Sequence, residues 1–219
     1  MPELSMQQMV GKGYSKLWNF KGRYVACKGS RASKKSKTVA LWIISHIIEY
    51  PEANAIYIRK TERTLKDSCY SDCKWAIHKL GLDDWFKCRL SPLEIEYKKT
   101  GQRILFRGCD DPLKLTSISV PNGVLCWAVF EEAYEINKES DFDMIDESIR
   151  GEIPEGYFKR IFVLLNPWSE KHWIKKRFFD SPDDDNKLSM TTNYKCNEWL
   201  TPDDLRIFED MRIRNPRRY

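Results

Sequence analysis

A loop of small and basic residues carries the groups best suited to bind a phosphate. It comprises Gly29, Ser30, Arg31, Ala32, Ser33, Lys34, Lys35, Ser36 and Lys37. A short strand-like run over 23–28 precedes it, and an apolar helix is predicted over 35–50. Backbone N–H groups and the helix dipole at a helix N-terminus favour anions. Lys35 would reach the β- and γ-phosphates of a nucleotide, and the Ser36 hydroxyl would take one position on Mg²⁺.

The loop departs from the pattern G-x-x-x-x-G-K-[ST] at one position, because Lys34 stands where the pattern has glycine. Glycine there lets the backbone approach a phosphate closely, and a side chain in the left-handed conformation costs about 1–2 kcal/mol. The alternative interpretation of the loop is a basic segment before an ordinary core helix.

Two adjacent acids follow the most apolar predicted strand, which covers 124–130. We expect Glu131 to hold Mg²⁺ through water, and Glu132 to orient and deprotonate an attacking water molecule. Neighbouring side chains of a strand point to opposite faces, so a turn must redirect Glu132. The alternative is a polar loop that begins after a core strand.

Asn166 follows another buried strand, predicted over 160–165. Its side chain could sense the γ-phosphate or the water that attacks it. The alternative is an Asn-Pro turn, which needs no ligand.

Strands alternate with helices along most of the chain, which predicts a mainly parallel sheet flanked by helices. Another strand is expected over 55–59, then a helix over 61–80 that Thr61 caps and Gly81 ends. An antiparallel hairpin is expected over 93–97 and 103–107. Later elements are helices over 142–150, 168–179 and 202–211 and a strand over 188–192. The division expected is a core over 1–179 and a smaller segment over 180–219.

Composition limits the class of protein. The chain has 219 residues, enough for one large domain, and a net charge of +5 with basic residues gathered over 21–37. No run reaches the roughly 18 apolar residues that a membrane span needs, and no export signal is apparent. The seven cysteines show no metal-binding spacing and are expected to be reduced thiols. The aromatic residues before the first strand, Tyr14, Trp18 and Phe20, could cover the sheet edge or contact an adenine.

Six motifs in order support a more specific identification. They are the loop 29–36, Arg59-Lys60, the segment 108–118, Phe130 to Ala133, the segment 165–168 with His172-Trp173, and the segment 191–197. Over residues 20 to 219, this set resembles the ATPase half of tailed-phage large terminase subunits.

The resemblance implies an α/β P-loop NTPase fold of the additional-strand type with a small C-terminal lid. It implies ATP and Mg²⁺ as cofactors, and hydrolysis that drives double-stranded DNA into a procapsid in the host cytoplasm. Implied partners are the portal protein, the small terminase subunit and further copies of the chain in a pentameric ring, without a membrane. A nuclease domain normally follows this part of the family, and nuclease activity is not expected here.

The resemblance also implies roles for residues at matching positions. Lys35 and Ser36 match the phosphate-binding pair, and Glu131 and Glu132 match the acidic pair. Arg31 matches an arginine that contacts the γ-phosphate, and Asn166 matches the motif that couples hydrolysis to lid movement. Arg150 and Lys114 are candidates for an arginine-finger role toward a neighbouring subunit. The acids Asp141, Asp143 and Asp146 have helical spacing and are expected on the surface.

Three other functions stay open from the sequence. One is a helicase-like P-loop ATPase, which strand separation would identify. Another is a non-catalytic nucleic-acid-binding module, whose binding would depend steeply on salt and not on ATP. The last is a ring subunit that binds nucleotide weakly because of Lys34.

Overall fold

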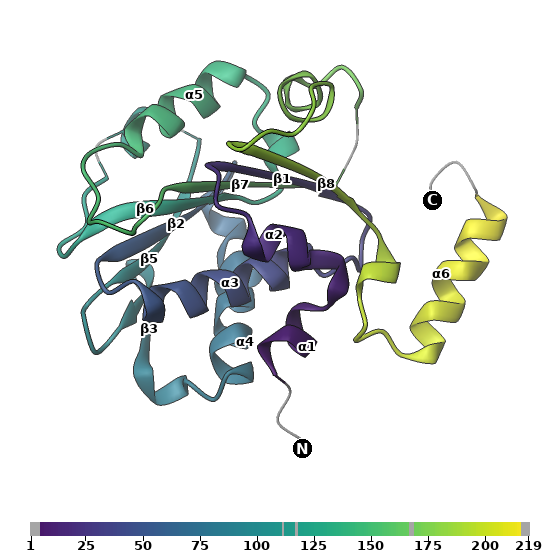
Figure 1. Ribbon diagram of the computed structural model, residues 1–219, viewed down its shortest axis with the longest axis horizontal. Coiled ribbons are helices and arrows are strands. Elements are labelled where there is room, and N and C mark those ends of the chain that lie inside the picture. Colours follow the sequence, from purple (N-terminus) through teal and green to yellow (C-terminus); the bar gives the residue numbers. More distant parts are fainter. Residues whose placement is uncertain (1–4, 111, 117, 167–168, 216–219) are drawn as a thin grey trace.

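One mixed sheet of eight strands forms the centre of the molecule (Figure 1). The structure, a computed structural model, describes residues 5–110, 112–116, 118–166 and 169–215. The strands are β1 (Tyr24–Gly29), β2 (Ala53–Arg59), β3 (Phe86–Leu90), β4 (Leu93–Tyr97), β5 (Arg103–Gly108), β6 (Val124–Phe130), β7 (Arg160–Leu165) and β8 (Lys187–Thr192). Their order across the sheet is β3-β4-β5-β2-β6-β7-β1-β8, and all pairs are parallel except β3 with β4 and β4 with β5.

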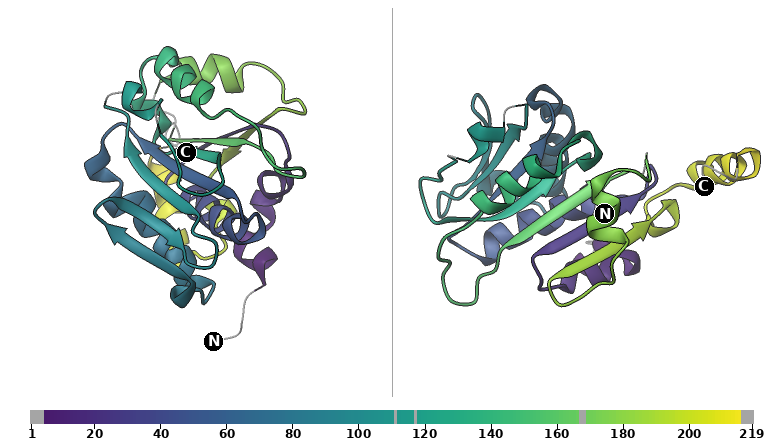
Figure 2. Two further views of the ribbon diagram at one scale, coloured as in Figure 1. Left: turned by 90° about the vertical axis from the view of Figure 1, so that its left-hand side faces the viewer. Right: turned by 90° about the horizontal axis from the view of Figure 1, so that it is seen from above.

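Helices cover both faces of the sheet (Figures 1 and 2). The α-helices are α1 (Met6–Val10), α2 (Ser15–Asn19), α3 (Lys35–Glu49), α4 (Ser71–Lys79), α5 (Glu139–Ser148) and α6 (Pro202–Arg214). Two π-helical segments are η3 (Lys66–Tyr70) and η7 (Lys175–Phe179). One apolar cluster joins the sheet to α1 to α4, and a second joins its other face to α5 and η7. α3 is buried on nearly all sides, as its continuous apolar sequence predicts.

The parallel strands bring the predicted site residues to one edge of the sheet. β1, β6 and β7 run in the same direction, so the loop after Gly29, the acids after Phe130 and Asn166 after Leu165 all follow carboxyl ends of strands. β7 lies between β1 and β6. This inserted strand is what distinguishes the additional-strand type of P-loop fold, and that predicted fold class is confirmed.

Several elements differ from the sequence prediction. The helix expected over 61–80 is divided into a short 3₁₀ turn (Glu62–Thr64), η3 and α4, and the Thr61 side chain does not cap it. β3 was missed because it is an edge strand in which only Phe86 is buried. The hairpin of β4 and β5 is confirmed as antiparallel. The start of the helix expected over 168–179 lies outside the described residues, and η7 forms its last turn.

Asp146 was expected at the surface, and this expectation is wrong. The residue is buried on α5, where Arg23 donates from Nε to Oδ1 at 3.1 Å and the Tyr24 hydroxyl donates to Oδ2 at 2.6 Å. Both donors lie on or next to β1, so this carboxylate ties α5 to the sheet. A buried carboxylate is tolerated when it is paired with a cation and hydrogen-bonded, as that of Asp146 is.

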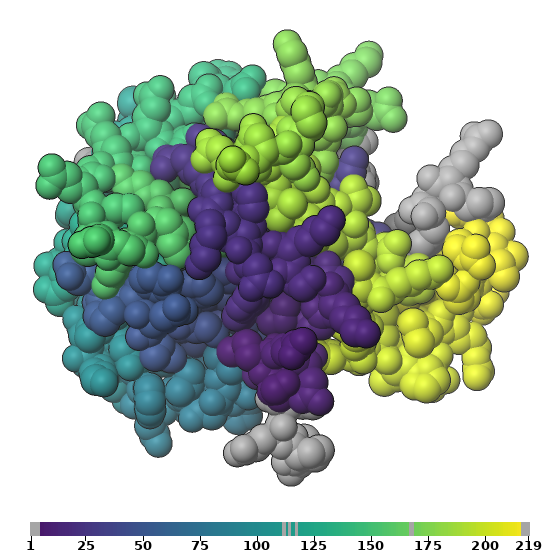
Figure 3. Space-filling model, in the orientation of Figure 1, coloured from purple at the N-terminus to yellow at the C-terminus, as the bar shows by residue number. Residues whose placement is uncertain are grey.

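The C-terminal segment has two parts. β8 pairs with β1 along its whole length and so belongs to the sheet, whereas α6 stands away from the body (Figures 1 and 2). Figure 3 shows the N-terminal segment, in purple, on the surface between the yellow-green C-terminal part and the rest. The division near residue 180 stays a prediction. In the part of the chain that the structure describes, no helix is both long and apolar enough to cross a membrane.

Candidate active site

The loop between β1 and α3 has an unusual backbone. Ala32 and Lys34 both have φ of 63°, in the left-handed region, and α3 begins directly after Lys34. For a residue with a side chain this conformation costs about 1–2 kcal/mol. Gly29 is required for another reason, because a Cβ atom there would stand 2.3 Å from Thr192 Oγ1. The loop therefore has the shape of a phosphate loop although Lys34 replaces the usual glycine.

Residues from both ends of the chain hold this loop in place. The buried Tyr14 hydroxyl donates to Ser33 O, and Asn197 Nδ2 donates to Ala32 O at 2.8 Å. Ser30 N donates to Thr192 O at 3.2 Å. Burial raises the pKa of Tyr14, so its hydroxyl keeps the proton that it donates. Two of these contacts occupy carbonyl groups of the loop, and the third occupies the Ser30 N–H. The first N–H groups of a helix such as α3 have no partner within the helix and can bind an anion.

Side chains that follow β6 and β7 meet the first two residues of α3. Lys35 Nζ donates to Asn166 Oδ1 at 2.7 Å, and the Ser36 hydroxyl donates to Glu131 Oε1 at 2.8 Å. Lys35 and Glu131 are buried. The structure thus brings Lys35 and Ser36 of α3 together with Glu131 and Asn166, which lie far from them in the sequence, after β6 and β7.

The two neighbouring acids stand in different surroundings. Burial raises the pKa of Glu131 to about 7, against the opposing effects of the Ser36 hydrogen bond and the Lys35 charge. Glu132 has φ of 49°, so the chain turns directly after Glu131. Its Oε2 is buried and has no hydrogen-bond partner among the described residues. A buried acceptor without a partner is costly and is often found where a ligand completes the site.

The other predicted loop residues do not join this group. The Arg31 side chain is exposed. Lys37 Nζ lies 3.2 Å from Asp72 Oδ1 and 4.2 Å from the centre of the Trp75 ring. The Lys34 side chain contacts the N- and C-terminal segments instead of Asn166 or Glu131. These three side chains do not gather around Lys35 in this structure, and the predicted contact of Arg31 with a γ-phosphate stays a prediction.

Two oxygen donors suitable for Mg²⁺ lie side by side at the start of α3. The Ser36 hydroxyl and the Glu131 carboxylate are joined by the 2.8 Å hydrogen bond, and both are predicted metal ligands. Mg²⁺ binds through one or two carboxylates together with substrate phosphates, so this donor set fits it. Within the described ranges, no group of three or more His, Cys, Asp or Glu could hold a metal without such a substrate.

The remaining candidates lie away from this centre. Arg150 is exposed after α5, and the Lys114 side chain lies outside the described residues. Pro167 and Trp168, which follow Asn166 in the predicted motif, also lie outside them. Trp18 packs edge-on against His46 of α3, with ring centres 6.0 Å apart. Trp18 thus packs on α3 and Tyr14 contacts the loop at Ser33 O, whereas a contact of these aromatic residues with an adenine stays a prediction.

The sequence missed the residues that brace the loop. Tyr14, Thr192 and Asn197 are far from the loop in sequence, and only the folded chain brings them to it. Residues 191–197 belonged to the ordered motif set, so the motif was the one signal that could have indicated them.

Comparison with known proteins was made on the sequence and on the fold. The family model described as "Phage terminase large subunit" matches residues 21–219. The "Terminase, large subunit" of Bacillus phage SPP1 is 31% identical over 194 residues, which cover 88% of this chain and 46% of that protein. The "PBSX phage terminase large subunit" of Bacillus subtilis (strain 168) is 28% identical over 163 residues, covering 74% of this chain and 35% of that protein.

Solved structures with the same fold include the large terminase from a thermophilic bacteriophage. Its complex with ADP superposes with a TM-score of 0.72 at 17% identity, covering 92% of this chain and 50% of that one. The complex with ATP-gamma-S gives a TM-score of 0.68 at 16% identity, covering 92% and 49%. This chain therefore spans half or less of the length of each of these relatives.

Proposed function

Because the chain belongs to the phage terminase large subunit family, we propose that it hydrolyses ATP to drive double-stranded DNA into a procapsid. The observation that carries the proposal is the meeting of Lys35, Ser36, Glu131 and Asn166 at the carboxyl edge of the sheet. The thermophilic-phage terminase, which shares the fold, has been solved with ADP and with ATP-gamma-S. A nucleotide at the corresponding loop of this chain is consistent with both facts.

In the proposed reaction, water attacks the γ-phosphate of ATP. The N–H groups at the start of α3 and the Lys35 ammonium bind the phosphates and offset the charge that develops on them. Glu132 orients the attacking water and accepts its proton on the buried Oε2, which has no other partner among the described residues. Asn166, which holds Lys35 Nζ at 2.7 Å, releases it to the γ-phosphate. Positioning of this kind supplies most of the catalysis in phosphoryl transfer.

Ser36 and Glu131 would hold Mg²⁺ beside the β- and γ-phosphates. The ion supplies positive charge to the transferred phosphoryl group. Before nucleotide binds, two features make the buried position of Glu131 acceptable. The Ser36 hydroxyl donates a hydrogen bond to it, and burial raises its pKa, which favours the protonated acid.

Two exposed arginines have roles in this proposal. Arg31 reaches the γ-phosphate when nucleotide fills the loop, and Arg150 is a candidate to act on the site of a neighbouring subunit. A cation supplied by a neighbour can raise phosphoryl-transfer rates by roughly 10³–10⁵. The proposed partners are duplex DNA, the portal protein, the procapsid, the small terminase subunit and further copies in a pentameric ring in the host cytoplasm.

The test is phosphate release from ATP with Mg²⁺, with and without duplex DNA. Glu132→Gln should keep nucleotide binding and lose turnover, because an amide cannot accept the proton. Lys35→Ala should lose both, because the ammonium contacts the phosphates directly. Lys16→Ala and Glu155→Gln, which change exposed residues of the same types, are the matched controls.

Retained turnover in Glu132→Gln would contradict the assignment of the base. Binding of DNA that ATP does not change, with no turnover in any variant, would instead support a nucleic-acid-binding module. Strand separation coupled to turnover would support a helicase.

A further inference from the structure

The side chain of Lys34 is enclosed between the two ends of the chain. Only 1% of it is exposed, and its ammonium forms an ion pair with Glu198. Met9 O lies 3.5 Å from Nζ, and the ring centres of Trp199 and Tyr14 lie 4.8 Å and 5.9 Å from it. The residue that replaces the expected glycine is therefore not directed into the loop.

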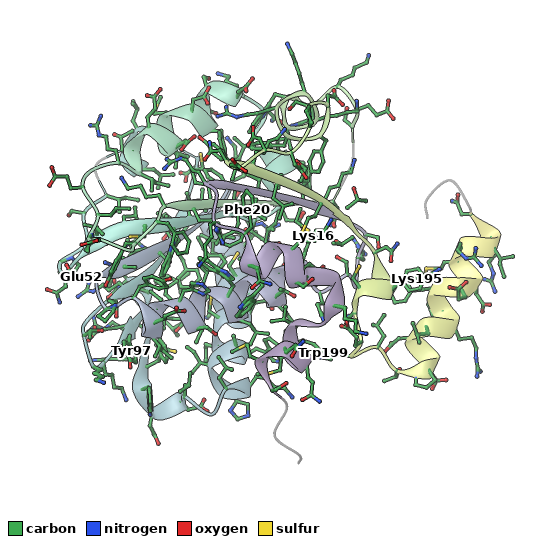
Figure 4. All side chains as sticks on the ribbon, in the orientation of Figure 1. Lys16, Phe20, Glu52, Tyr97, Lys195 and Trp199 are labelled. Atoms are coloured by element: carbon green, nitrogen blue, oxygen red, sulfur yellow. The ribbon has the colours of Figure 1, made fainter. Side chains whose placement is uncertain are left out.

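Further residues pack against the partners of Lys34. Glu198 lies so close to Gly11 that a Cβ atom there would stand 2.1 Å from Glu198 Oε1. Trp199 packs against Trp75 of α4 with ring centres 5.1 Å apart, and Lys37 Nζ lies 4.2 Å from the centre of the Trp75 ring. Figure 4 shows Trp199 on the segment that leads to α6, beside the N-terminal helices.

Two unfavourable features of Lys34 are compensated by this arrangement. Its backbone is left-handed, and its charge is removed from water. A buried ammonium is stable only when it is paired, and Glu198 and the aromatic rings supply that pairing. The side-chain contacts thus hold the backbone conformation that a glycine would adopt without help.

We propose that Lys34 is a positioning residue whose contacts with Glu198 and Trp199 hold the phosphate loop ready for nucleotide and join it to the segment before α6. The proposal depends on the proposed function for the identity of the ligand. It has one unexpected consequence. Restoring the glycine of the usual pattern weakens nucleotide binding, because the loop loses its connection to Glu198.

The first arm of the test measures the Kd of ADP with Mg²⁺ by calorimetry. Lys34→Gly, Lys34→Met and Glu198→Gln should each weaken binding by about tenfold, which is 1.4 kcal/mol. The double variant Lys34→Met with Glu198→Gln should bind no more weakly than either single variant, because both remove the same contact. Lys34→Arg, which keeps the charge, should restore most of the affinity. Lys16→Met is the control for removal of an exposed lysine.

The second arm is hydrogen exchange, which needs no ligand. In Lys34→Met, the loop and the segment before α6 should separate more often. If the fraction of molecules in which they are separated rises about tenfold, amides of residues 30–36 and of residues 195–200 should exchange about tenfold faster. Added ADP should slow exchange over 195–200 in the wild type and not in this variant. A purely structural role would not produce that difference.

Two results would overturn the inference. One is a Lys34→Gly variant that binds ADP as tightly as the wild type or more tightly. The other is faster exchange confined to residues 30–36. If the wild type binds no ADP, the proposed function fails, and exchange over 195–200 in Lys34→Met still decides whether the loop and that segment are joined.

Discussion

At the scale of single residues, Glu131 and Glu132 show how neighbouring acids obtain different chemistry. Glu131 is buried and receives the Ser36 hydrogen bond, whereas Glu132 keeps a buried oxygen without a partner among the described residues. Environments that differ in this way give two neighbouring carboxyl groups different roles. The backbone of Glu132 is left-handed, with φ of 49°, so the strand geometry ends between the two acids.

The pKa of Glu131 makes a prediction about stability. Burial raises it from 4.5 to about 7, so between these pH values the folded chain holds a proton that the unfolded chain has released. The stabilisation is complete below pH 4.5 and is lost as pH rises through 7. Relative to Glu131→Gln, the free energy of unfolding of the wild type should fall by roughly 3 kcal/mol over this window.

Urea unfolding at pH values from 4.5 to 8 would measure the difference. The control is Glu155→Gln, whose curve should stay parallel to that of the wild type because Glu155 is exposed. Parallel curves for Glu131→Gln and the wild type would show that Glu131 ionises as it does in water.

The sequence indicated the reactive residues better than the residues that hold them. Lys35, Ser36, Glu131 and Asn166 each follow or begin an element with a clear pattern, so their meeting could be predicted from parallel strands. Tyr14 and Glu198 gave no such signal. Their contacts with the loop arise from the packing of distant segments, which no local spacing encodes.

At the scale of elements, two buried amides join segments of the fold. Gln102 Nε2 lies 3.0 Å from Ile47 O, 2.6 Å from Tyr50 O and 2.8 Å from Ala53 O. These carbonyls belong to the end of α3 and the start of β2, which follows it. The side-chain amide of Asn54 joins β2 to β6, since its Nδ2 donates to Val124 O at 3.2 Å.

Replacing Gln102 by methionine should therefore destabilise the fold. Ile47 O would be left buried without a donor, because Pro51 has no N–H to offer it, whereas Tyr50 O keeps its bond from Ala53 N. The expected cost is about 1–3 kcal/mol in the free energy of unfolding. Gln7→Met, a change of the same type at an exposed position, should alter it by less than about 0.5 kcal/mol. Equal stability of both variants would show that water replaces the amide.

Element prediction succeeded where pattern and length agreed. α3, β6 and the hairpin of β4 and β5 lie where the sequence placed them. The prediction of one helix over 61–80 failed because the residues have helical spacing, whereas the backbone forms a π turn at Lys66–Tyr70. Such a turn depends on tertiary packing rather than on propensity. β3 could not be predicted because an edge strand with one buried residue lacks the alternation of buried and exposed residues that marks a strand.

At the scale of the whole molecule, nucleotide binding should appear as thermal stabilisation. ADP with Mg²⁺ at a hundred times its Kd would add about 2.7 kcal/mol of stability. For a chain of this size the melting temperature should rise by roughly 5–10 °C. Lys35→Ala should show no rise and Lys16→Ala should show the full rise. An equal rise in Lys35→Ala would place the nucleotide elsewhere.

The position of β1 has a consequence for biosynthesis. β1 is near the start of the chain, yet both of its neighbours, β7 and β8, are made far later, with Tyr24 beside Ile161 and Lys187. As the chain leaves the ribosome, this strand has no partner for either edge until β7 has been translated. The phosphate loop is thus translated before the strands that complete its surroundings, and the nascent chain keeps at least one free edge of β1, which is prone to aggregate, until β8 emerges.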